Sequence, residues 1–433
     1  MNTYDSDRMK DSLLPLGYQE SKDLQDADII VINTCHIREK ASEKVFSELG
    51  RLRKVKERAA EQQNRHVKIV VAGCVAQAEG EEITKRAPWV DIVVGPQTYH
   101  RLPDLVAKLD PVDRRHLIDT DFPPETKFDF LPEKIGKRGP AAFLSVQEGC
   151  DKFCSFCVVP YTRGSEFSRS AKAIINEAKK LISSGTKELT LLGQNVNAWH
   201  GEGLDGKEWG LGRLIRELAD LPELYRIRYT TSHPLDMDDE LINAHAEVDK
   251  LMPYLHLPIQ SGSDKILHAM NRRHTASDYL RIIERLRSVR EDVAMSGDFI
   301  VGFPGETDRD FADTINLINK VGYASAYSFK YSARLGTPAA EKSEQVLEHI
   351  KSERLLALQQ LLDAQQYAFN KNCESMEFEV LVEQRGVKGG KLNARTPYMQ
   401  SVYFEGSESL IGKIVRVKVL DGRQNSLFAE IVS

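Results

Sequence analysis

Short runs of β-branched and other apolar residues alternate with helix-like segments along the first part of the chain. Three runs, Asp28–Asn33, Lys68–Ala72 and Asp91–Gly95, have the character of buried strands, and Arg38–Arg58 has the character of a helix. Apolar strands that alternate with helices are typical of a parallel, doubly wound sheet. The chain opens with a helix-like segment, Asp5–Leu14, and the strand that should precede this helix is missing.

A second and longer alternation of strands and helices follows. Its six expected strands are Ala142–Gln147, Leu189–Gln194, Arg226–Thr231, Tyr254–Ile259, Ser296–Val301 and Ala324–Tyr331. The five helices between them are Ala171–Ser184, Leu211–Leu221, Asp239–Val248, Ala276–Glu291 and Asp308–Val321. Six βα units are fewer than the eight of a complete barrel, so the pattern predicts an incomplete (βα)6 barrel that is open on one side. Chemistry in such barrels lies at the carboxyl ends of the strands.

The pattern changes again after a long charged helix, about Glu344–Asn370. Five short alternating strands with turn residues between them predict a small all-β barrel of the oligonucleotide-binding kind. They are Phe378–Val382, Leu392–Arg395, Ser401–Phe404, Ile414–Leu420 and Leu427–Val432. Basic and aromatic residues gather here: Arg385, Lys388, Lys391, Arg395, Tyr398, Tyr403 and Phe404. They would bind RNA phosphates and stack on bases, or they are core aromatics beside a solvated loop, and the sequence leaves both interpretations open.

These changes of pattern divide the chain into four segments. We expect an N-terminal domain at residues 1–112, a linker rich in Pro, Asp and Lys at 113–135, the barrel core at 136–368 and the small β-barrel at 371–433. The net charge of −5 does not indicate a nucleic-acid-binding protein, although a local basic patch would suffice. Without a long apolar run or a signal-peptide pattern, we expect a cytoplasmic protein that does not contact a membrane. We also expect it to be a monomer.

Three cysteines lie close together directly after the first strand of the barrel. Cys150, Cys154 and Cys157 have a spacing that is poor for disulfides and suits one shared metal centre. Soft thiolates select zinc, copper(I) or iron–sulfur clusters. A structural zinc site would require a fourth protein ligand, and no Cys or His follows at the spacing of a zinc finger. Three ligands on a four-iron cluster leave one iron open to a substrate or cofactor.

Two further cysteines follow strands of the first domain. Cys35 and Cys74 each lie just past the carboxyl end of a predicted strand, where open α/β sheets carry their ligand crevice. We therefore expect both thiols to face the same crevice. A third thiolate would lie most naturally in the stretch that precedes the first helix. Cys373 is far from the other cysteines, and we expect it to be structural.

Five motifs resemble those of the methylthiotransferases, a family of radical S-adenosylmethionine (SAM) enzymes. They are Asn33-Thr-Cys-His-Ile-Arg-Glu-Lys-Ala41, the run from Glu148 to Gly164, Leu192-Gly-Gln-Asn-Val-Asn197, His256-Leu-Pro-Ile-Gln-Ser-Gly262 and the run from Asp298 to Thr307. The first motif and Val158-Val-Pro-Tyr-Thr-Arg-Gly164 are similar to the MiaB-type branch, which acts on N6-(dimethylallyl)adenosine in tRNA. The resemblance implies an N-terminal methylthiotransferase domain, a radical SAM core and a C-terminal RNA-binding TRAM domain.

The resemblance also implies a cofactor for the clustered cysteines. Cys150, Cys154 and Cys157 would bind the [4Fe–4S] cluster that cleaves SAM, and Phe156 would lie beside the adenine of SAM. The ribose or the methionine end of SAM would be held by three residues at strand ends: Gln194, Gln260 and Asp298.

A second, auxiliary [4Fe–4S] cluster is implied in the first domain. Cys35 and Cys74 match the second and third of its three cysteine ligands. In the family, Gly-Cys-x-Met-Asn precedes the first helix, and this sequence starts at the Met-Asn of that pattern. Either Met1 is an internal methionine of a longer protein, with an in-frame cysteine codon two positions upstream, or the auxiliary cluster lacks a ligand and sulfur insertion is in doubt.

The implied reaction transfers a sulfur-containing group. It converts N6-(dimethylallyl)adenosine at position 37 of a tRNA anticodon stem-loop to its 2-methylthio derivative, with a second SAM as methyl donor. The implied partners are a low-potential electron donor of the flavodoxin or ferredoxin type and a sulfur donor system. Two alternatives stay open: a sister methylthiotransferase that acts on threonylcarbamoyl-adenosine or a ribosomal-protein aspartate, and an Fe–S RNA-binding redox sensor without catalytic turnover.

Overall fold

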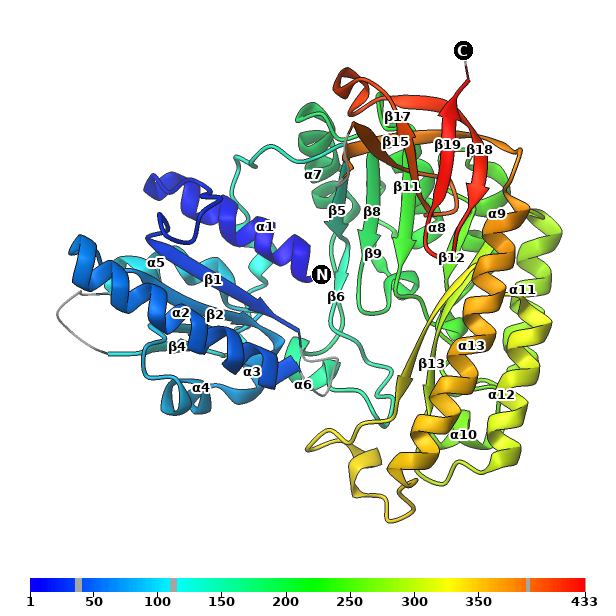
Figure 1. Cartoon of the computed structure of the whole chain (residues 1–433), viewed down its shortest axis with the longest axis horizontal. Coiled ribbons are helices and arrows are strands. Elements are labelled where there is room, and N and C mark those ends of the chain that lie inside the picture. The colour runs from blue at the N-terminus through cyan, green and yellow to red at the C-terminus, as the bar shows by residue number, and fades with distance from the viewer. Residues whose placement is uncertain (36–40, 110–114, 387–389, 433) are drawn as a thin grey trace. The chain divides into compact units, whose positions relative to one another are not determined.

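The computed structural model describes residues 1–35, 41–109, 115–386 and 390–432 (Figure 1). The chain divides into two compact units, and each takes part of the segment around the clustered cysteines. The first unit consists of Met1–Gly136, Gly149–Asp151 and Val158–Glu166, and the second of Lys137–Glu148, Lys152–Cys157 and Phe167–Ser433. In the described part of the chain, no helix has the length and apolar character needed to cross a bilayer.

The first unit contains a parallel sheet with strand order β1-β2-β3-β4. Its strands are β1 (Ile29–Thr34), β2 (Lys68–Gly73), β3 (Ile92–Val94) and β4 (Leu117–Asp119). Its helices are α1 (Asn2–Leu13), α2 (Ala41–Gln63), α3 (Cys74–Glu79), α4 (Glu81–Arg86) and α5 (Leu102–Lys108).

Alternate residues of β2 enter two different hydrophobic cores, because successive side chains of a strand point to opposite faces of its sheet. Ile69 and Val71 pack in the core that includes residues of α2, α3 and α4. Val70 and Ala72 pack in the core that includes residues of α1 and α5. Both faces of the sheet are therefore covered, which confirms the predicted doubly wound architecture.

Strand β4 lies inside the range that the sequence predicts as a linker, residues 113–135. It pairs in parallel with β3, with Leu117 opposite Ile92 and Asp119 opposite Val94. Its three residues are all only half-buried, so they lack the continuous apolar signal of β1 to β3. The linker prediction is wrong for these residues, since they form the edge of the sheet.

Helix α1 carries buried charged residues into the first unit. Asp5 Oδ2 lies 2.6 Å from the Nη2 atom of Arg163, and Asp5 Oδ1 lies 3.4 Å from the Nζ atom of Lys127. Burial opposes ionisation of Asp5, but the positive charges of Arg163 and Lys127 outweigh it and lower its pKa. Arg163 belongs to the motif that follows the clustered cysteines, and this pair holds that motif within the first unit.

The second unit begins with six parallel strands. They are β5 (Ala141–Ser145), β8 (Glu188–Leu192), β11 (Arg226–Thr230), β12 (Tyr254–His256), β13 (Ala294–Val301) and β14 (Ser325–Lys330). They form two sheets, of order β11-β8-β5 and β12-β13-β14, which a single parallel bridge between Ile227 and Leu251 connects. Among the described strands, β5 and β14 do not pair, so the barrel is open, as predicted.

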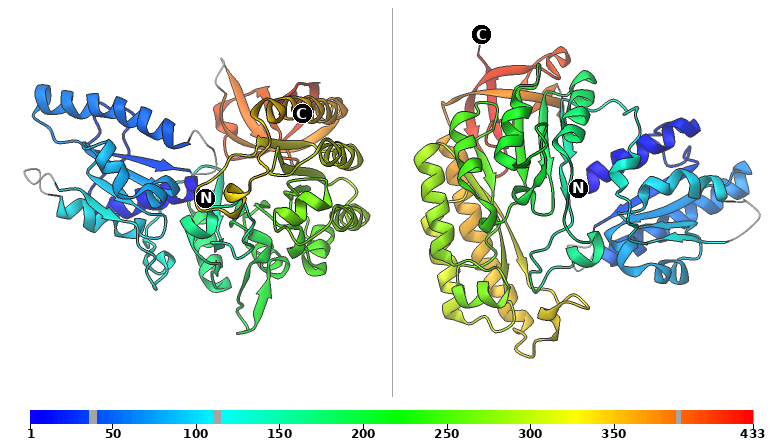
Figure 2. Two further views of the ribbon diagram at one scale, coloured as in Figure 1. Left: turned by 90° about the horizontal axis from the view of Figure 1, so that it is seen from below. Right: turned by 180° about the vertical axis from the view of Figure 1, so that it is seen from behind.

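Helices alternate with these strands and lie outside them (Figure 2). They are α7 (Ala171–Ser183), α8 (Leu211–Ala219), α9 (Asp239–Glu247), α10 (Asp264–Ala269), α11 (Ala276–Val289) and α12 (Asp308–Val321). Thr275 and Thr307 start α11 and α12 with capping boxes, in which the threonine hydroxyl accepts from the third backbone N–H of the helix. Short elements occupy the loops, including β6 (Gln147–Glu148) paired with β7 (Phe167–Ser168), and the helix α6 (Val159–Arg163) in the first unit.

A closed five-stranded barrel ends the chain after helix α13 (Glu348–Asn372). Its strands are β15 (Glu377–Arg385), β16 (Lys391–Arg395), β17 (Ser401–Glu405), β18 (Ile414–Gly422) and β19 (Leu427–Ile431). The amino ends of β8 and β11 hold this barrel: Arg226 and Arg228 donate to four of its backbone carbonyls, and Glu188 pairs with both arginines. The C-terminal barrel thus contacts the strand ends opposite to those where chemistry is expected.

Replacement of Gly73 by alanine tests the close approach of β1 and β2. Gly73 has φ +92°, and a Cβ atom there would meet the carbonyl oxygen of Thr34 and the side-chain oxygen of Asn33. We expect Gly73→Ala to lower the free energy of unfolding by about 2 to 5 kcal/mol in urea denaturation, from the left-handed backbone and the overpacking together. Gly17→Ala is the matched control, because Gly17 has φ +85° and open space around it. An equal loss in both variants would contradict the close approach.

Candidate functional site

The loop that carries Cys154 and Cys157 is fixed by residues that come more than a hundred positions later. Ser155 donates through its backbone N–H and its hydroxyl to two carbonyls at the end of α10, at 3.0 and 2.9 Å. Asn271 Nδ2 donates to the carbonyl of Phe153 at 2.8 Å. Cys157 N–H donates to the carbonyl of Cys154 at 2.9 Å and closes a tight turn. The two thiols are therefore held by a preformed loop.

A carboxylate joins this loop to the end of β8. Asp236 Oδ1 lies 2.8 Å from the Nζ atom of Lys152, and Asp236 Oδ2 accepts from Asn195 Nδ2 at 2.9 Å. Asn195 belongs to the motif Leu192-Gly-Gln-Asn-Val-Asn197 and follows Gln194. The backbone N–H groups of both residues donate to Gln147 Oε1, at 3.0 and 3.2 Å. The polar residues after β8 thus form one network with the cysteine loop.

Cys150 belongs to the first unit, whereas Cys154 and Cys157 belong to the second, so the surroundings of the three thiols are described separately. Cys150 N–H donates to the carbonyl of Gly164 at 3.3 Å. All six cysteines are in the described part of the chain, none forms a disulfide, and these three are half-buried. Among the described residues, no three Cys, His, Asp or Glu side chains are arranged to hold a metal ion.

Two of the predicted SAM-binding residues, Gln260 and Asp298, lie together in the structure, and His256 lies beside Asp298. Gln260 N–H donates to the carbonyl of Asp298 at 3.0 Å, and Gln260 has a left-handed φ of +84°. Asp298 Oδ2 lies 3.6 Å from the Nε2 atom of His256, whose Nδ1 contacts Ser296 Oγ at 3.0 Å. A strained non-glycine backbone costs about 1 to 3 kcal/mol and is typical of functional sites. Gln194 lies in the other sheet, at the end of β8.

Phe156 is half-buried and packs against a hydrophobic cluster. The buried members of this cluster are Ile266, Met270, Phe303, Tyr331 and Ala339. Phe156 therefore holds the cysteine loop by this packing, and its place beside the adenine of SAM stays a prediction. The neighbouring Phe153 is 55% exposed at a left-handed φ of +49°.

The first unit places Cys35 and Cys74 at one edge of its sheet. The register pairs Thr34 with Gly73, so the two cysteines follow directly opposed positions on neighbouring strands. Thr34 Oγ1 donates to a carbonyl of β2 at 2.6 Å and accepts from Val75 N–H at 3.1 Å. Cys35 is exposed and Cys74 is half-buried, and the crevice that the two thiols would share stays a prediction. Residues 36–40, the rest of the motif after Cys35, lie outside the described residues.

Part of the predicted basic and aromatic cluster of the C-terminal barrel is structural. Phe404 is buried in the barrel core, and Tyr398 packs against Phe369 and Phe378 with ring centroids 5.6 and 5.7 Å away. Arg395 pairs with Glu383 at 3.3 Å, Arg385 pairs with Glu408 at 3.2 Å, and Lys388 lies outside the described residues. The core interpretation is therefore correct for these two aromatic residues.

A different group forms what we call the basic–aromatic surface: Lys391, Tyr403, Arg423 and Phe428. The ring of Phe428 lies 4.7 Å from Lys391 Nζ and 3.8 Å from the guanidinium carbon of Arg423. Its centroid is 5.9 Å from that of Tyr403, which it faces across the β17–β19 register. Only Lys391 and Tyr403 belonged to the predicted cluster, because β19 and the turn before it are distant in sequence.

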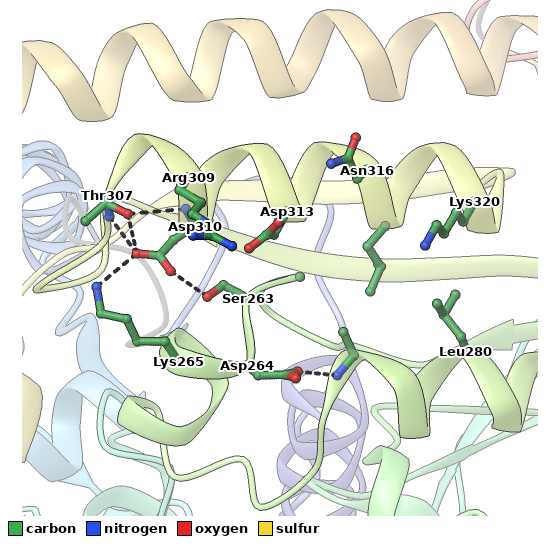
Figure 3. A pocket seen from close by; sticks show the side chains of 13 residues that line it. Ser263, Asp264, Lys265, Leu280, Thr307, Arg309, Asp310, Asp313, Asn316 and Lys320 are labelled. Atoms are coloured by element: carbon green, nitrogen blue, oxygen red, sulfur yellow. Dashed lines mark hydrogen bonds and ion pairs between the residues drawn. The ribbon is translucent and has the colours of Figure 1, made fainter.

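A cavity of about 590 Å³ lies between the start of α10 and the helices α11 and α12 (Figure 3). The carboxylate of Asp310 lines this cavity and accepts hydrogen bonds from Ser263, Lys265 and the capping Thr307. These bonds hold the pKa of Asp310 below its usual value, although burial opposes them. The cavity contains none of the clustered cysteines or predicted SAM contacts, and its carboxylate has a structural role in starting α12.

Three known families match successive parts of the chain. They are the uncharacterized protein family UPF0004 at residues 1–95, the radical SAM superfamily at residues 144–318 and the TRAM domain at residues 371–432. Together these three domains fit a radical SAM methylthiotransferase. The chain thus contains a radical SAM domain at residues 144–318 and a C-terminal TRAM domain at residues 371–432.

Two solved structures share much of this fold. One is the radical S-adenosylmethionine methyltransferase TsrM from Kitasatospora setae with cobalamin and a [4Fe-4S] cluster bound: TM-score 0.55, 14% identity, 78% of this chain and 74% of that chain covered. The other is the cobalamin-dependent S-adenosylmethionine radical enzyme OxsB: TM-score 0.53, 12% identity, 83% of this chain and 53% of that chain covered. At these identities the likeness concerns the fold.

In the radical SAM core, helix α13 is tied to the loop after β13. Glu306 Oε1 accepts from Gly302 N–H at 2.8 Å and from Arg354 Nη1 of α13 at 2.7 Å. Burial raises the pKa of Glu306, against the opposing effect of these two donors. The helix that leads into the TRAM barrel is therefore fixed to a strand end of the core.

Two buried histidines of the radical SAM core have no ligand spacing in the sequence, and their contact with each other was not predicted. The rings of His233 and His274 meet edge to face with centroids 5.6 Å apart. Neither Nε2 atom has a hydrogen-bond partner among the described residues. Burial lowers the pKa of both residues, that of His274 to about 4, and the charge of Arg272 contributes. Both imidazoles are therefore neutral at physiological pH.

These two histidines predict a loss of stability in mild acid. A histidine that stays neutral when folded but takes up a proton when unfolded destabilises the fold as the pH falls below about 6.5. Between pH 6.5 and 5.5 each should cost about 1 kcal/mol in urea denaturation. His274→Gln should therefore lose about 1 kcal/mol less than the wild type over this interval, whereas His200→Gln, at an exposed site, should match the wild type. Equal losses of unfolding free energy in the wild type and both variants would contradict the conclusion that His274 is neutral in the folded protein.

Proposed function

We propose that this enzyme methylthiolates tRNA, converting N6-(dimethylallyl)adenosine at position 37 to 2-methylthio-N6-(dimethylallyl)adenosine. The observation that carries the proposal is the joining, in one chain, of a three-cysteine loop on an open radical SAM barrel to a UPF0004 domain and a TRAM domain. The resemblance of the motifs around Cys35 and Arg163 to the MiaB-type branch supports this substrate.

The cysteine loop would hold the SAM-cleaving [4Fe–4S] cluster through Cys150, Cys154 and Cys157. Half-buried thiols that form no disulfide are suitable cluster ligands. Arg272 also donates a hydrogen bond to Cys154 Sγ, and such a bond stabilises a thiolate ligand more than a neutral thiol. When bound, the cluster and SAM supply the radical chemistry that replaces an unactivated aromatic C–H bond, which no side-chain acid or nucleophile can break. The protein supplies binding, orientation and the exclusion of water.

The carboxyl edge of the barrel would bind SAM. Gln260 and Asp298 lie together there, and Gln194 lies at the end of β8 in the network that reaches the cysteine loop. In the first unit, Cys35 and Cys74 would hold the auxiliary cluster that provides sulfur, and a second SAM would provide the methyl group. A low-potential electron donor of the flavodoxin or ferredoxin type and a sulfur donor system complete the reaction, and the enzyme would act as a cytoplasmic monomer.

The anticodon stem-loop suits the open barrel, because a loop base is already unpaired and is splayed out into a pocket at modest cost. The basic–aromatic surface of the TRAM barrel would bind the RNA through phosphates and stacking. That barrel contacts the amino ends of β8 and β11, whereas the proposed SAM site would lie at the carboxyl ends. A substrate that reaches both must be extended, which favours a structured RNA over a free nucleoside.

Nucleoside analysis of tRNA from a deletion strain tests the proposed substrate. We expect loss of 2-methylthio-N6-(dimethylallyl)adenosine, accumulation of the unmethylthiolated nucleoside and restoration by the wild-type gene. Cys154→Ala should fail to restore the modification, whereas Cys373→Ala should succeed, because Cys373 packs in the TRAM barrel core. An unchanged 2-methylthio level would contradict the substrate, and a defect in threonylcarbamoyl-adenosine or a ribosomal-protein aspartate would assign a sister activity.

Binding of an anticodon stem-loop at several salt concentrations tests the basic–aromatic surface. Phe428→Ala should weaken binding by about 1 to 3 kcal/mol, the value of one stacked base. Arg423→Ala should reduce the salt dependence by about one phosphate contact. Arg416→Ala, which removes an exposed charge from β18, is the matched control and should have a smaller effect. Equal effects of Arg416→Ala and Arg423→Ala would contradict a specific RNA surface.

A further inference from the structure

Arg272 is a buried cation that contacts one of the clustered cysteines. Arg272 comes shortly after the end of α10 in the chain and is only 5% exposed. Its Nη1 atom lies 3.5 Å from Cys154 Sγ, and its Nη2 atom donates to the carbonyl of Pro258 at 2.5 Å. The two nitrogens of one rigid fork thus hold a sulfur atom and a backbone carbonyl at the same time.

The chain on both sides of Arg272 fixes the guanidinium in this place. Asn271 and Arg273 both have left-handed backbones, with φ +60° and +57°. Asn271 also donates to the carbonyl of Phe153 in the cysteine loop. Such backbone conformations are uncommon for residues other than glycine and persist where the surrounding structure requires them. The contact between Arg272 and Cys154 is therefore part of the local fold and does not depend on a flexible surface side chain.

The charge of Arg272 lacks an acidic partner. In the described part of the chain, no carboxylate forms an ion pair with it, and its second hydrogen bond goes to the neutral carbonyl of Pro258. A guanidinium stays protonated in proteins, and a buried charge is costly unless an opposite charge compensates it. A thiolate at Cys154 that ligates iron would supply that negative charge.

We propose that Arg272 is a positioning residue that raises the reduction potential of the SAM-cleaving cluster through a charge-assisted N–H···S hydrogen bond to Cys154. The proposal rests on the proposed function only in taking Cys154 as a cluster ligand. One electron from an external low-potential reductant enters the cluster without bond cleavage, and the added negative charge lies beside the guanidinium. Hydrogen bonds to the sulfur atoms and net charge both set such potentials.

Redox titration of the reconstituted full-length protein tests this proposal. Arg272→Gln, Arg272→Lys and Arg273→Gln are prepared without oxygen, their iron content is measured, and the reduced cluster is followed by electron paramagnetic resonance. We expect Arg272→Gln to lower the equilibrium constant of one-electron reduction about tenfold, a shift of about 59 mV to more negative potential. Arg272→Lys keeps the positive charge but loses the two-pronged guanidinium. The reduction potential of its cluster should therefore lie between those of the wild type and Arg272→Gln. Arg273→Gln is the matched control at an exposed neighbour and should keep the wild-type potential.

The outcomes separate this proposal from the proposed function. An Arg272→Gln cluster with wild-type potential would overturn the role of Arg272 and leave the function standing. Loss of the cluster from both Arg272 variants, with retention in Arg273→Gln, would replace a tuning role with a structural one and also overturn the proposal. A wild-type protein that binds no iron would overturn the proposed function.

Discussion

The structure depends on holding a short thiol-bearing loop in place with residues from distant parts of the chain. Hydrogen bonds from Ser155 and Asn271, and the Lys152–Asp236 ion pair, fix the part of the loop in the second unit. Arg163 pairs with the buried Asp5 and so fixes, within the first unit, the segment that follows the cysteine loop. The loop carries few apolar side chains of its own, so these polar contacts, together with the packing of Phe156, determine where its sulfur atoms lie.

The second unit uses the two ends of its parallel strands differently. Its strands carry polar residues at the carboxyl ends, where Gln260, Asp298 and His256 meet. Their amino ends carry Arg226 and Arg228, which hold the TRAM barrel by its backbone carbonyls. Six parallel strands thus separate these polar residues from the TRAM barrel, and Arg354 of helix α13 pairs with Glu306 in the loop after β13. This separation is the reason for proposing an extended RNA substrate in preference to a small metabolite.

The architecture was predictable because its signals are local. Periodic apolar runs identified the six barrel strands and the doubly wound sheet, and the spacing of Cys150, Cys154 and Cys157 identified the candidate site. Strand β4 was missed, because three half-buried residues carry no periodic signal. Arg272 and the His233–His274 pair were missed because their significance comes from contacts with residues distant in sequence. The basic–aromatic surface was only partly predicted, since Phe428 and Arg423 join Lys391 through barrel closure.

Formation of 5′-deoxyadenosine tests the central claim most directly. Protein reconstituted with iron and sulfide is incubated without oxygen with SAM, dithionite and an anticodon stem-loop that carries N6-(dimethylallyl)adenosine. The account predicts 5′-deoxyadenosine from the wild type and none above background from Cys157→Ala, since radical cleavage of SAM requires the three-cysteine cluster. A wild-type protein that holds a four-iron cluster but forms no 5′-deoxyadenosine would contradict the account and indicate a redox sensor.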